Sequence, residues 1–144
     1  IAASRIATEL CTRLDPPFAT RLDVRSAAAP ASLTVPWRGL VQTLASLVKN
    51  GFEASGEGGR VELTIEAAGD RARFVVKDQG QGMTAEALAH VGEPFFTTKP
   101  PGAGMGLGVF LARAFADRLG GSLTFDSAES RGTRAVLELP LRPG

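Results

Sequence analysis

Residues 60–78 read RVELTIEAAGDRARFVVKD, and this stretch predicts the centre of the fold. Apolar and polar side chains alternate through its first half, which is typical of a β-strand with one buried face. Gly69-Asp70 is a two-residue hairpin signal, so the second half is interpreted as the returning strand. The apolar faces of the two strands then agree, which specifies the register. The expected cross-strand pairs are Ile65 with Phe74, Leu63 with Val76, and Val61 with Asp78.

Helical and strand patterns flank this hairpin on both sides. Helices are predicted over residues 4–14, 36–54 and 105–119, with a short one over 84–89. Further strands are predicted over residues 21–25, 33–35, 122–127 and 133–139. Residues 90–103 lack periodicity and are interpreted as a long loop. This order of elements predicts an α+β fold, a two-layer sandwich in which helices cover one face of a mixed, mostly antiparallel sheet.

The composition is that of one folded domain and excludes several classes of protein. The chain has 144 residues, 16 basic and 15 acidic, so its net charge of +1 draws it neither to nucleic acid nor to an anionic membrane. No apolar run approaches the roughly 20 residues of a membrane helix. A single cysteine and a single histidine exclude a disulfide framework and a cysteine-cluster or two-histidine metal site. The sequence starts at Ile1 without an initiator Met, which suggests a fragment.

Glycine is in excess, with 17 residues, many of them between positions 80 and 108. Residues 102–108 read GAGMGLG and lead into a predicted helix. Exposed N–H groups at a helix N-terminus bind anions, and missing Cβ atoms let phosphates approach. A Rossmann dinucleotide fingerprint does not fit, because Val109 stands where a third small residue is required and no strand precedes the motif. A phosphate-binding loop and a plain flexible loop remain as alternatives.

Residues 78–82 read DQGQG and follow the hairpin directly. The predicted register places Asp78 at a strand end on the buried face, where an isolated carboxylate is costly. Such a carboxylate favours a ligand that donates a hydrogen bond, for example the exocyclic amine of adenine. The alternative is an Asx-turn, in which Asp78 accepts a hydrogen bond from its own backbone.

Two further segments carry groups suited to a nucleotide. The long predicted helix has a polar row, Gln42, Ser46 and Asn50, and the Asn50 carbonyl is a hard ligand suited to Mg²⁺. A helix cap or a solvated residue is the alternative for Asn50. Residues 93–99 read EPFFTTK, whose threonines and lysine could contact phosphate. Alternatively, Phe95 or Phe96 could pack into the core and anchor this loop there.

Taken in order, these motifs resemble the catalytic, ATP-binding domain of sensor histidine kinases, which has the Bergerat fold shared with gyrase B, Hsp90 and MutL. The resemblance covers about residues 20–140. Residues 92–121 are especially similar to the RegB and PrrB redox-sensing kinases. Residues 44–55 resemble the N box, 78–82 the G1 box, 94–99 the F box, 104–108 the G2 box, and Gly132-Thr133 the last glycine–threonine element.

The resemblance implies a role for each matching residue. The two catalytic residues would be Asn50 and Lys99. Asn50 would coordinate the Mg²⁺ that bridges the ATP phosphates, and Lys99 would approach the phosphates from the lid. Asp78 would accept from adenine N6, and Thr133 would lie near adenine through a bridging water. The full nucleotide site would comprise Asn50, Asp78, Gly80, Gly82, Met83, Phe95, Thr97, Thr98, Lys99, Gly104, Met105, Gly106, Leu107, Gly108 and Thr133.

The resemblance also implies a function. The chain would transfer the γ-phosphoryl group of ATP to a histidine on a separate dimerisation domain, chiefly by positioning and charge neutralisation. Residues 1–20 would be a helix and linker from the dimerisation region, and residues 21–144 the catalytic domain. ATP, Mg²⁺, the dimerisation domain and indirectly a response regulator are expected partners, with no nucleic acid and no direct membrane contact. The fragment is expected in the cytoplasm, even if its parent is membrane-anchored. It is also expected to be unable to autophosphorylate alone.

Four residues depart from the pattern or need separate treatment. Ser46 stands where the kinases often have a first N-box Asn, so the affinity for the metal is expected to be modest. The ATP-hydrolysing relatives usually have a glutamate at this position, and serine is a poor base, so ATP hydrolysis is disfavoured. Gly51 replaces the usual Ala after Asn50. His90 is not followed by an acid and is interpreted as a lid or surface residue, not the phosphoacceptor. Cys11 is predicted to be a buried small hydrophobe, with a redox-reactive thiol as the alternative.

Other functions of the same fold stay open at this point. One is a nucleotide-gated switch or docking module, which the residue at Ser46 keeps open. The other is an ATPase or serine kinase without histidine kinase activity.

Overall fold

The computed structural model describes residues 3–13, 21–27, 36–55, 59–68, 71–80, 82, 85, 89, 108–127 and 132–140. The helices within these residues are α1 (Ala3–Arg13), α3 (Trp37–Ser55) and α5 (Gly108–Arg118). The strands are β1 (Leu22–Ala27), β2 (Val61–Ala68), β3 (Arg71–Asp78), β4 (Ser122–Ser127) and β5 (Thr133–Pro140).

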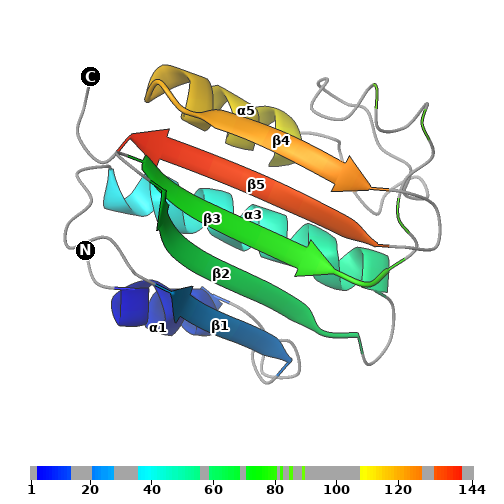
Figure 1. Cartoon of the computed structure of the whole chain (residues 1–144). Coiled ribbons are helices and arrows are strands. Elements are labelled where there is room, and N and C mark those ends of the chain that lie inside the picture. The colour runs from blue at the N-terminus through cyan, green and yellow to red at the C-terminus, as the bar shows by residue number, and fades with distance from the viewer. Residues whose placement is uncertain are drawn as a thin grey trace.

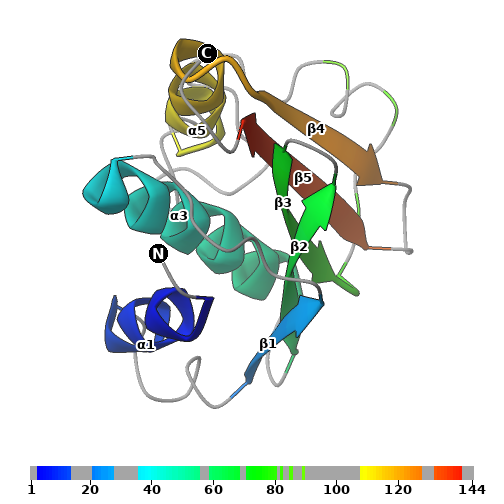
Figure 2. The same cartoon turned by 60° about the vertical axis from the view of Figure 1, so that its left-hand side comes forward.

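The strands form one mixed sheet in the order β1-β2-β3-β5-β4. β1 runs parallel to β2, and the other neighbouring pairs are antiparallel. The described helices lie on one face of this sheet, with α3 across its middle, α1 behind β1 and α5 behind β4 (Figure 1). Figure 2 shows the helix layer and the strand layer from another side. This arrangement confirms the predicted two-layer α+β sandwich.

The β2–β3 register and the apolar stripe of α3 together form the core. The register contains the predicted pairs Val61–Asp78, Leu63–Val76 and Ile65–Phe74. The stripe of α3 consists of Leu40, Val41, Leu44, Leu47, Val48 and Phe52, each 4% exposed or less. Burying one such side chain stabilises the fold by about 1.5–3 kcal/mol. A shift of one residue in either strand would turn its apolar set to solvent, so the helix and the hairpin specify each other.

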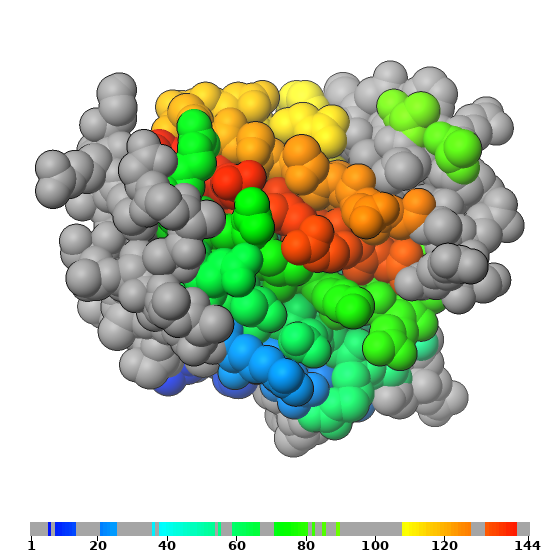
Figure 3. Space-filling model, in the orientation of Figure 1, coloured from blue at the N-terminus to red at the C-terminus, as the bar shows by residue number. Residues whose placement is uncertain are grey.

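The opposite face of the sheet, which faces the viewer in Figure 3, carries cross-strand pairs of charged side chains. Arg73 of β3 lies between Glu66 of β2 and Glu138 of β5, with N–O distances of 3.6 and 3.8 Å. Arg25 of β1 lies 4.0 Å from Glu62 of β2. Opposite charges placed across strands stabilise a sheet by about 0.2–1 kcal/mol for each pair. Charged members of the strand alternation therefore lie on this face, together with one buried valine pair of β3 and β5.

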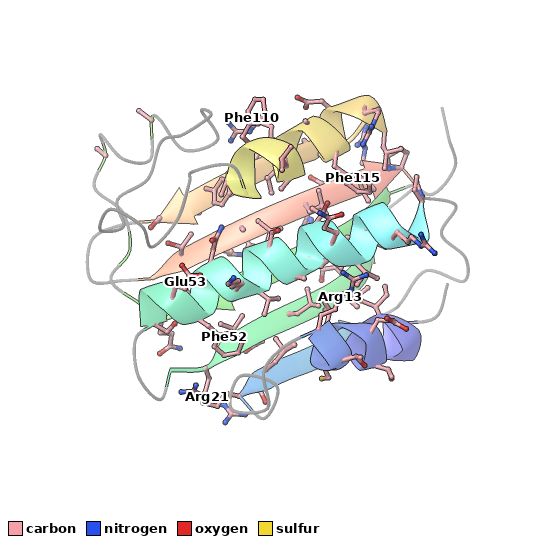
Figure 4. All side chains as sticks on the ribbon, turned by 180° about the vertical axis from the view of Figure 1, so that it is seen from behind. Arg13, Arg21, Phe52, Glu53, Phe110 and Phe115 are labelled. Carbon is pink, nitrogen blue, oxygen red and sulfur yellow. The ribbon has the colours of Figure 1, made fainter. Side chains whose placement is uncertain are left out.

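Side-chain contacts hold α3 between α5 and β1 (Figure 4). Gly39 of α3 leaves room for the Phe115 ring of α5, since a Cβ at Gly39 would lie 2.5 Å from Phe115 Cε1. Toward the other end of α3, the guanidinium carbon of Arg21 lies 5.9 Å from the centroid of the Phe52 ring, a cation–π contact. These two contacts lie near opposite ends of the helix that carries Asn50.

The prediction that Cys11 is buried is wrong, because its side chain is exposed. Ile6 and Leu10 define the buried side of α1, with exposed fractions of 2% and 0%. Cys11 follows Leu10 by about 100° around the helix, so it leaves the stripe. The predicted strand over 33–35 and the loop over 90–103 lie outside the described residues, as does the predicted helix over 84–89 except for Ala85 and Ala89. Among the helices that are described, none is both long and apolar enough to cross a membrane.

Candidate functional site

The candidate residues that the structure describes gather at one end of the sheet. β3 ends there at Asp78, and β5 starts there at Thr133, directly opposite in register. The C-terminal half of α3 and the N-terminus of α5 lie over the same end (Figure 1). Residues far apart in the sequence are therefore neighbours because four elements begin or end at this place.

Asp78 is the buried polar group of this end, with an exposed fraction of 5%. Its Oδ1 accepts a hydrogen bond of 2.9 Å from the Gly80 N–H, so the backbone contact considered as an alternative is present. Burial raises the pKa of the Asp78 carboxyl, and the backbone N–H groups of Gly80 and Thr133 oppose that shift. A carboxylate has about four acceptor positions. The contact with Gly80 thus leaves Asp78 able to accept from a ligand as well.

Two glycines bring neighbouring backbone close to Asp78. A Cβ at Gly132, which has a φ of 80°, would collide with the Asp78 carbonyl oxygen. A Cβ at Gly51 of α3 would lie 3.5 Å from the Asp78 Cβ and 3.0 Å from Val61 Cγ2. Gly51, which stands where the kinases usually have Ala, therefore lies against the Asp78 side chain.

Asn50 and Ser46 lie beside the first turn of α5. A Cβ at Gly108 would be 4.0 Å from Asn50 Nδ2 and 3.9 Å from Ser46 Cβ. Both polar side chains are half-buried, whereas Gln42, the first member of the predicted polar row, is exposed. The structure thus places an amide and a hydroxyl next to the N–H groups that begin a helix, which favour an anion.

Ser127, the last residue of β4, is a member of the site that sequence reasoning missed. Its Oγ donates to the Gly132 carbonyl oxygen over 2.9 Å and lies 2.9 Å from Thr133 Oγ1. Thr133 in turn faces Asp78 in the register of β3 and β5. The signal that could have found Ser127 is the β4–β5 register, which places it opposite Thr133.

The remaining predicted site residues divide into two groups. Gly80 and Gly82 are half-buried beyond Asp78, and Gly82 has a φ of 70°, which suits glycine in the turn that follows β3. The others lie outside the described residues: Met83, Phe95, Thr97, Thr98, Lys99, Gly104, Met105, Gly106 and Leu107. His90 also lies outside them.

The described groups suit a ligand with two chemically different ends. The buried Asp78 and the half-buried Thr133 offer hydrogen-bond acceptors, which match a flat base with an amine. The start of α5, with Asn50 and Ser46 beside it, offers N–H dipoles and a hard oxygen ligand, which matches phosphate and a cation. A purine nucleotide carries both kinds of group.

Comparison with known proteins agrees with this arrangement. Residues 37–143 match the family described as histidine kinase-, DNA gyrase B-, and HSP90-like ATPase. The sensor protein DegM of Bacillus sp. (strain B21-2) is 38% identical over 100 residues, which are 69% of this chain and 26% of DegM. The sensor protein kinase FleS of Pseudomonas aeruginosa is 45% identical over 104 residues, which are 72% of this chain and 25% of FleS.

Solved structures give the same result for the fold. The catalytic domain of histidine kinase ThkA, in a nucleotide-free form, matches with a TM-score of 0.82 at 25% identity, over 99% of this chain and 95% of that one. The chain therefore belongs to the family of histidine kinase-, DNA gyrase B- and HSP90-like ATPases and has the fold of a histidine kinase catalytic domain. It spans about a quarter of the length of DegM and of FleS.

Proposed function

We propose that this chain binds ATP with Mg²⁺ and donates the γ-phosphoryl group to a histidine on a separate dimerisation domain. The observation that carries the proposal is the Asp78 carboxylate, 5% exposed at the end of β3 and opposite Thr133. The Gly80 N–H occupies one acceptor position of this buried carboxylate, and the adenine N6 amine is a suitable donor for another. The matching family and the sensor kinases among the relatives support histidine as the acceptor.

The phosphates would lie between α3 and the start of α5. Asn50 is assigned as the protein ligand of Mg²⁺, since an amide oxygen is a hard ligand and Mg²⁺ takes most other ligands from phosphates and water. When bound, Mg²⁺ neutralises phosphate charge during transfer. Ser46, beside Gly108, is a poor base for activating water, which supports transfer over hydrolysis.

The rest of the proposed site comes from the sequence motifs. Lys99 would contact the phosphates together with Thr97 and Thr98, and residues 104–107 would supply the glycine-rich loop before α5. Met83 and Phe95 would complete the base pocket. The finer similarity to RegB and PrrB stays a prediction about the subfamily.

In the parent protein, residues 1–20 are proposed to continue from the dimerisation region, with residues 21–144 as the catalytic domain. Ile6 and Leu10 of α1 belong to the same hydrophobic core as α3, so this linker helix would move with the catalytic domain. The dimerisation domain is the proposed direct partner and a response regulator the indirect one. The proposed location is the cytoplasm.

Titration calorimetry with ATP, in the presence and absence of Mg²⁺, tests the binding part of this proposal. We expect saturable binding of one ATP for each chain, tighter when Mg²⁺ is present because Asn50 would hold the cation and the cation would offset phosphate charge. No ATP binding under either condition would overturn the proposal. Binding without transfer to a supplied dimerisation domain would instead support a nucleotide-gated switch.

A further inference from the structure

Asp78, Thr133 and Ser127 form a row across the end of the sheet. Thr133 pairs with Asp78 in the β3–β5 register, and Ser127 pairs with Thr133 in the β4–β5 register. Residues directly opposite in antiparallel strands project to the same face. Asp78 is buried on the helix-covered face, so the side chains of Thr133 and Ser127 belong to that face too. Across the sheet, only Thr133 thus separates Ser127 from the carboxylate that is proposed to bind adenine.

Two hydrogen bonds of Ser127 determine the direction in which the Thr133 hydroxyl donates. Ser127 Oγ lies 2.9 Å from both the Gly132 carbonyl oxygen and Thr133 Oγ1. A carbonyl oxygen can only accept, and a serine hydroxyl has a single hydrogen. Ser127 therefore donates to Gly132, and the Thr133 hydroxyl donates to Ser127. With its hydrogen used in this way, Thr133 Oγ1 offers only lone pairs to anything else it meets.

We propose that Ser127 is a specificity-determining residue of the nucleotide site, acting by holding the Thr133 hydroxyl as an acceptor. This inference rests on the proposed function, in which Asp78 accepts from the amine at the six position of the purine and Thr133 lies beside Asp78 in the register. Two neighbouring acceptors favour a base with an amine at that position. They disfavour a base with a carbonyl there, because a carbonyl in direct contact with Asp78 and Thr133 would place acceptor against acceptor.

Ser127 also positions backbone that touches Asp78. Its hydroxyl holds the Gly132 carbonyl, and the α-carbon of Gly132 lies so close to Asp78 that a Cβ would strike the Asp78 carbonyl oxygen. Loss of Ser127 would therefore free the Thr133 hydroxyl to rotate and donate. It would also loosen the link between the start of β5 and the end of β3.

Binding of ATP and of inosine triphosphate, measured by calorimetry on the same chain, tests the inference. Inosine triphosphate has a carbonyl in place of the six-amine and a hydrogen on N1. We expect the wild type to prefer ATP, and Ser127→Ala to bind ATP about fivefold more weakly while losing little or no affinity for inosine triphosphate. The preference for ATP should therefore shrink. Ser127→Thr keeps a hydroxyl at the same place and should restore the preference.

A double-mutant comparison separates this role from a general loss of structure. Thr133→Val removes the hydroxyl that Ser127 is proposed to orient, so Ser127→Ala should change the ATP preference little in that background. Ser122→Ala, at the other end of β4 opposite Glu138, is the matched control and should leave the preference unchanged. Thermal unfolding of each variant checks that it folds.

The outcomes distinguish the two proposals. A wild type that binds no ATP overturns the proposed function and this inference with it. If the wild type prefers ATP, either of two results overturns the inference about Ser127 alone. One is an unchanged preference for ATP in Ser127→Ala. The other is a Ser127→Ala effect on that preference that is as large in the Thr133→Val background as in the wild type. If Ser127→Ala does not fold, Ser127→Cys, which keeps a small side chain with a much weaker donor, should show the same reduced preference.

Discussion

At the scale of single residues, the proposed site depends on how closely Asp78 is enclosed. Gly51 of α3 approaches its Cβ, and Gly132 approaches its carbonyl oxygen. This enclosure removes water from the carboxylate, which is why burial raises its pKa. The same enclosure makes the carboxylate selective, because a ligand without a donor cannot replace the lost water.

Asp78→Asn is predicted to weaken ATP binding by about tenfold or more, because an amide at this position replaces a charged acceptor and can present a donor to the adenine amine. Titration calorimetry measures the change. Asp126→Asn is the control, since Asp126 is an exposed acid on β4, opposite Arg134 in the register. Equal ATP affinity for Asp78→Asn and the wild type would remove Asp78 from the base pocket.

The raised pKa of Asp78 predicts how stability depends on pH. The folded-state pKa lies above the unfolded value of 3.8, so the carboxyl contributes stability at low pH that is lost as the pH rises through the folded-state pKa. Asparagine has no such proton. We therefore expect the free energy of unfolding of Asp78→Asn, relative to wild type, to increase between about pH 4 and pH 7. Denaturant unfolding at both pH values measures it, and a relative decrease contradicts the assignment.

At the scale of elements, the segments that enter β4 and β5 have different requirements for glycine. Gly120 and Gly132 both have a positive φ, 77° and 80°. A Cβ at Gly120 would meet nothing within 4 Å, whereas a Cβ at Gly132 would strike the end of β3. The pair therefore separates the strain of a left-handed backbone from a collision at the site.

Gly120→Ala is predicted to lower the free energy of unfolding by about 1–2 kcal/mol, the cost of a left-handed backbone, and to leave ATP affinity unchanged. Gly132→Ala should lower it further and also weaken ATP binding, because β5 must move away from Asp78. Denaturant unfolding and calorimetry on both variants measure the two effects. Equal results for the two variants would mean that the contact between Gly132 and Asp78 has no role in binding.

The elements also show what the sequence can predict. The register of β2 and β3 follows from strict alternation and a two-residue turn, so the buried position of Asp78 could be derived. The sequence predicts both β4 and β5, but their connection is longer than the two-residue turn of the first hairpin. It therefore does not fix the register that pairs Ser127 with Thr133. Cys11 was misplaced because helix phase, and not apolar character, decides its exposure. The proximity of Gly51 to Asp78 depends on how α3 crosses the sheet, which no local pattern encodes.

At the scale of the whole molecule, one sheet end collects groups from α3, β3, β5 and α5 (Figure 1). The helix layer supplies Asn50 and the N-terminus of α5, and the sheet supplies Asp78 and Thr133. Base and phosphates would thus be held by different layers. The single histidine of the chain is His90, which is not expected to accept phosphate, so the acceptor would be on another domain.

Asn50→Ala is predicted to leave ATP binding partly intact but to abolish phosphoryl transfer, because the base contacts remain while the metal loses its protein ligand. Gln42→Ala, one member of the same polar row on the exposed side of α3, is the matched control. Calorimetry reports the first property and transfer of labelled phosphate the second. Full transfer by Asn50→Ala would exclude Asn50 from the metal role.

Phosphoryl transfer between separate chains tests most directly whether this chain donates the γ-phosphoryl group to a histidine of the dimerisation domain. This chain is mixed with the dimerisation domain of its parent kinase, Mg²⁺ and ATP labelled at the γ-phosphate. We expect label on the dimerisation domain, as an acid-labile phosphohistidine. The dimerisation domain should stay unlabelled when this chain is omitted, and this chain should stay unlabelled when it is incubated without that domain. A chain that binds ATP and Mg²⁺ yet leaves the dimerisation domain unlabelled would contradict the proposed transfer.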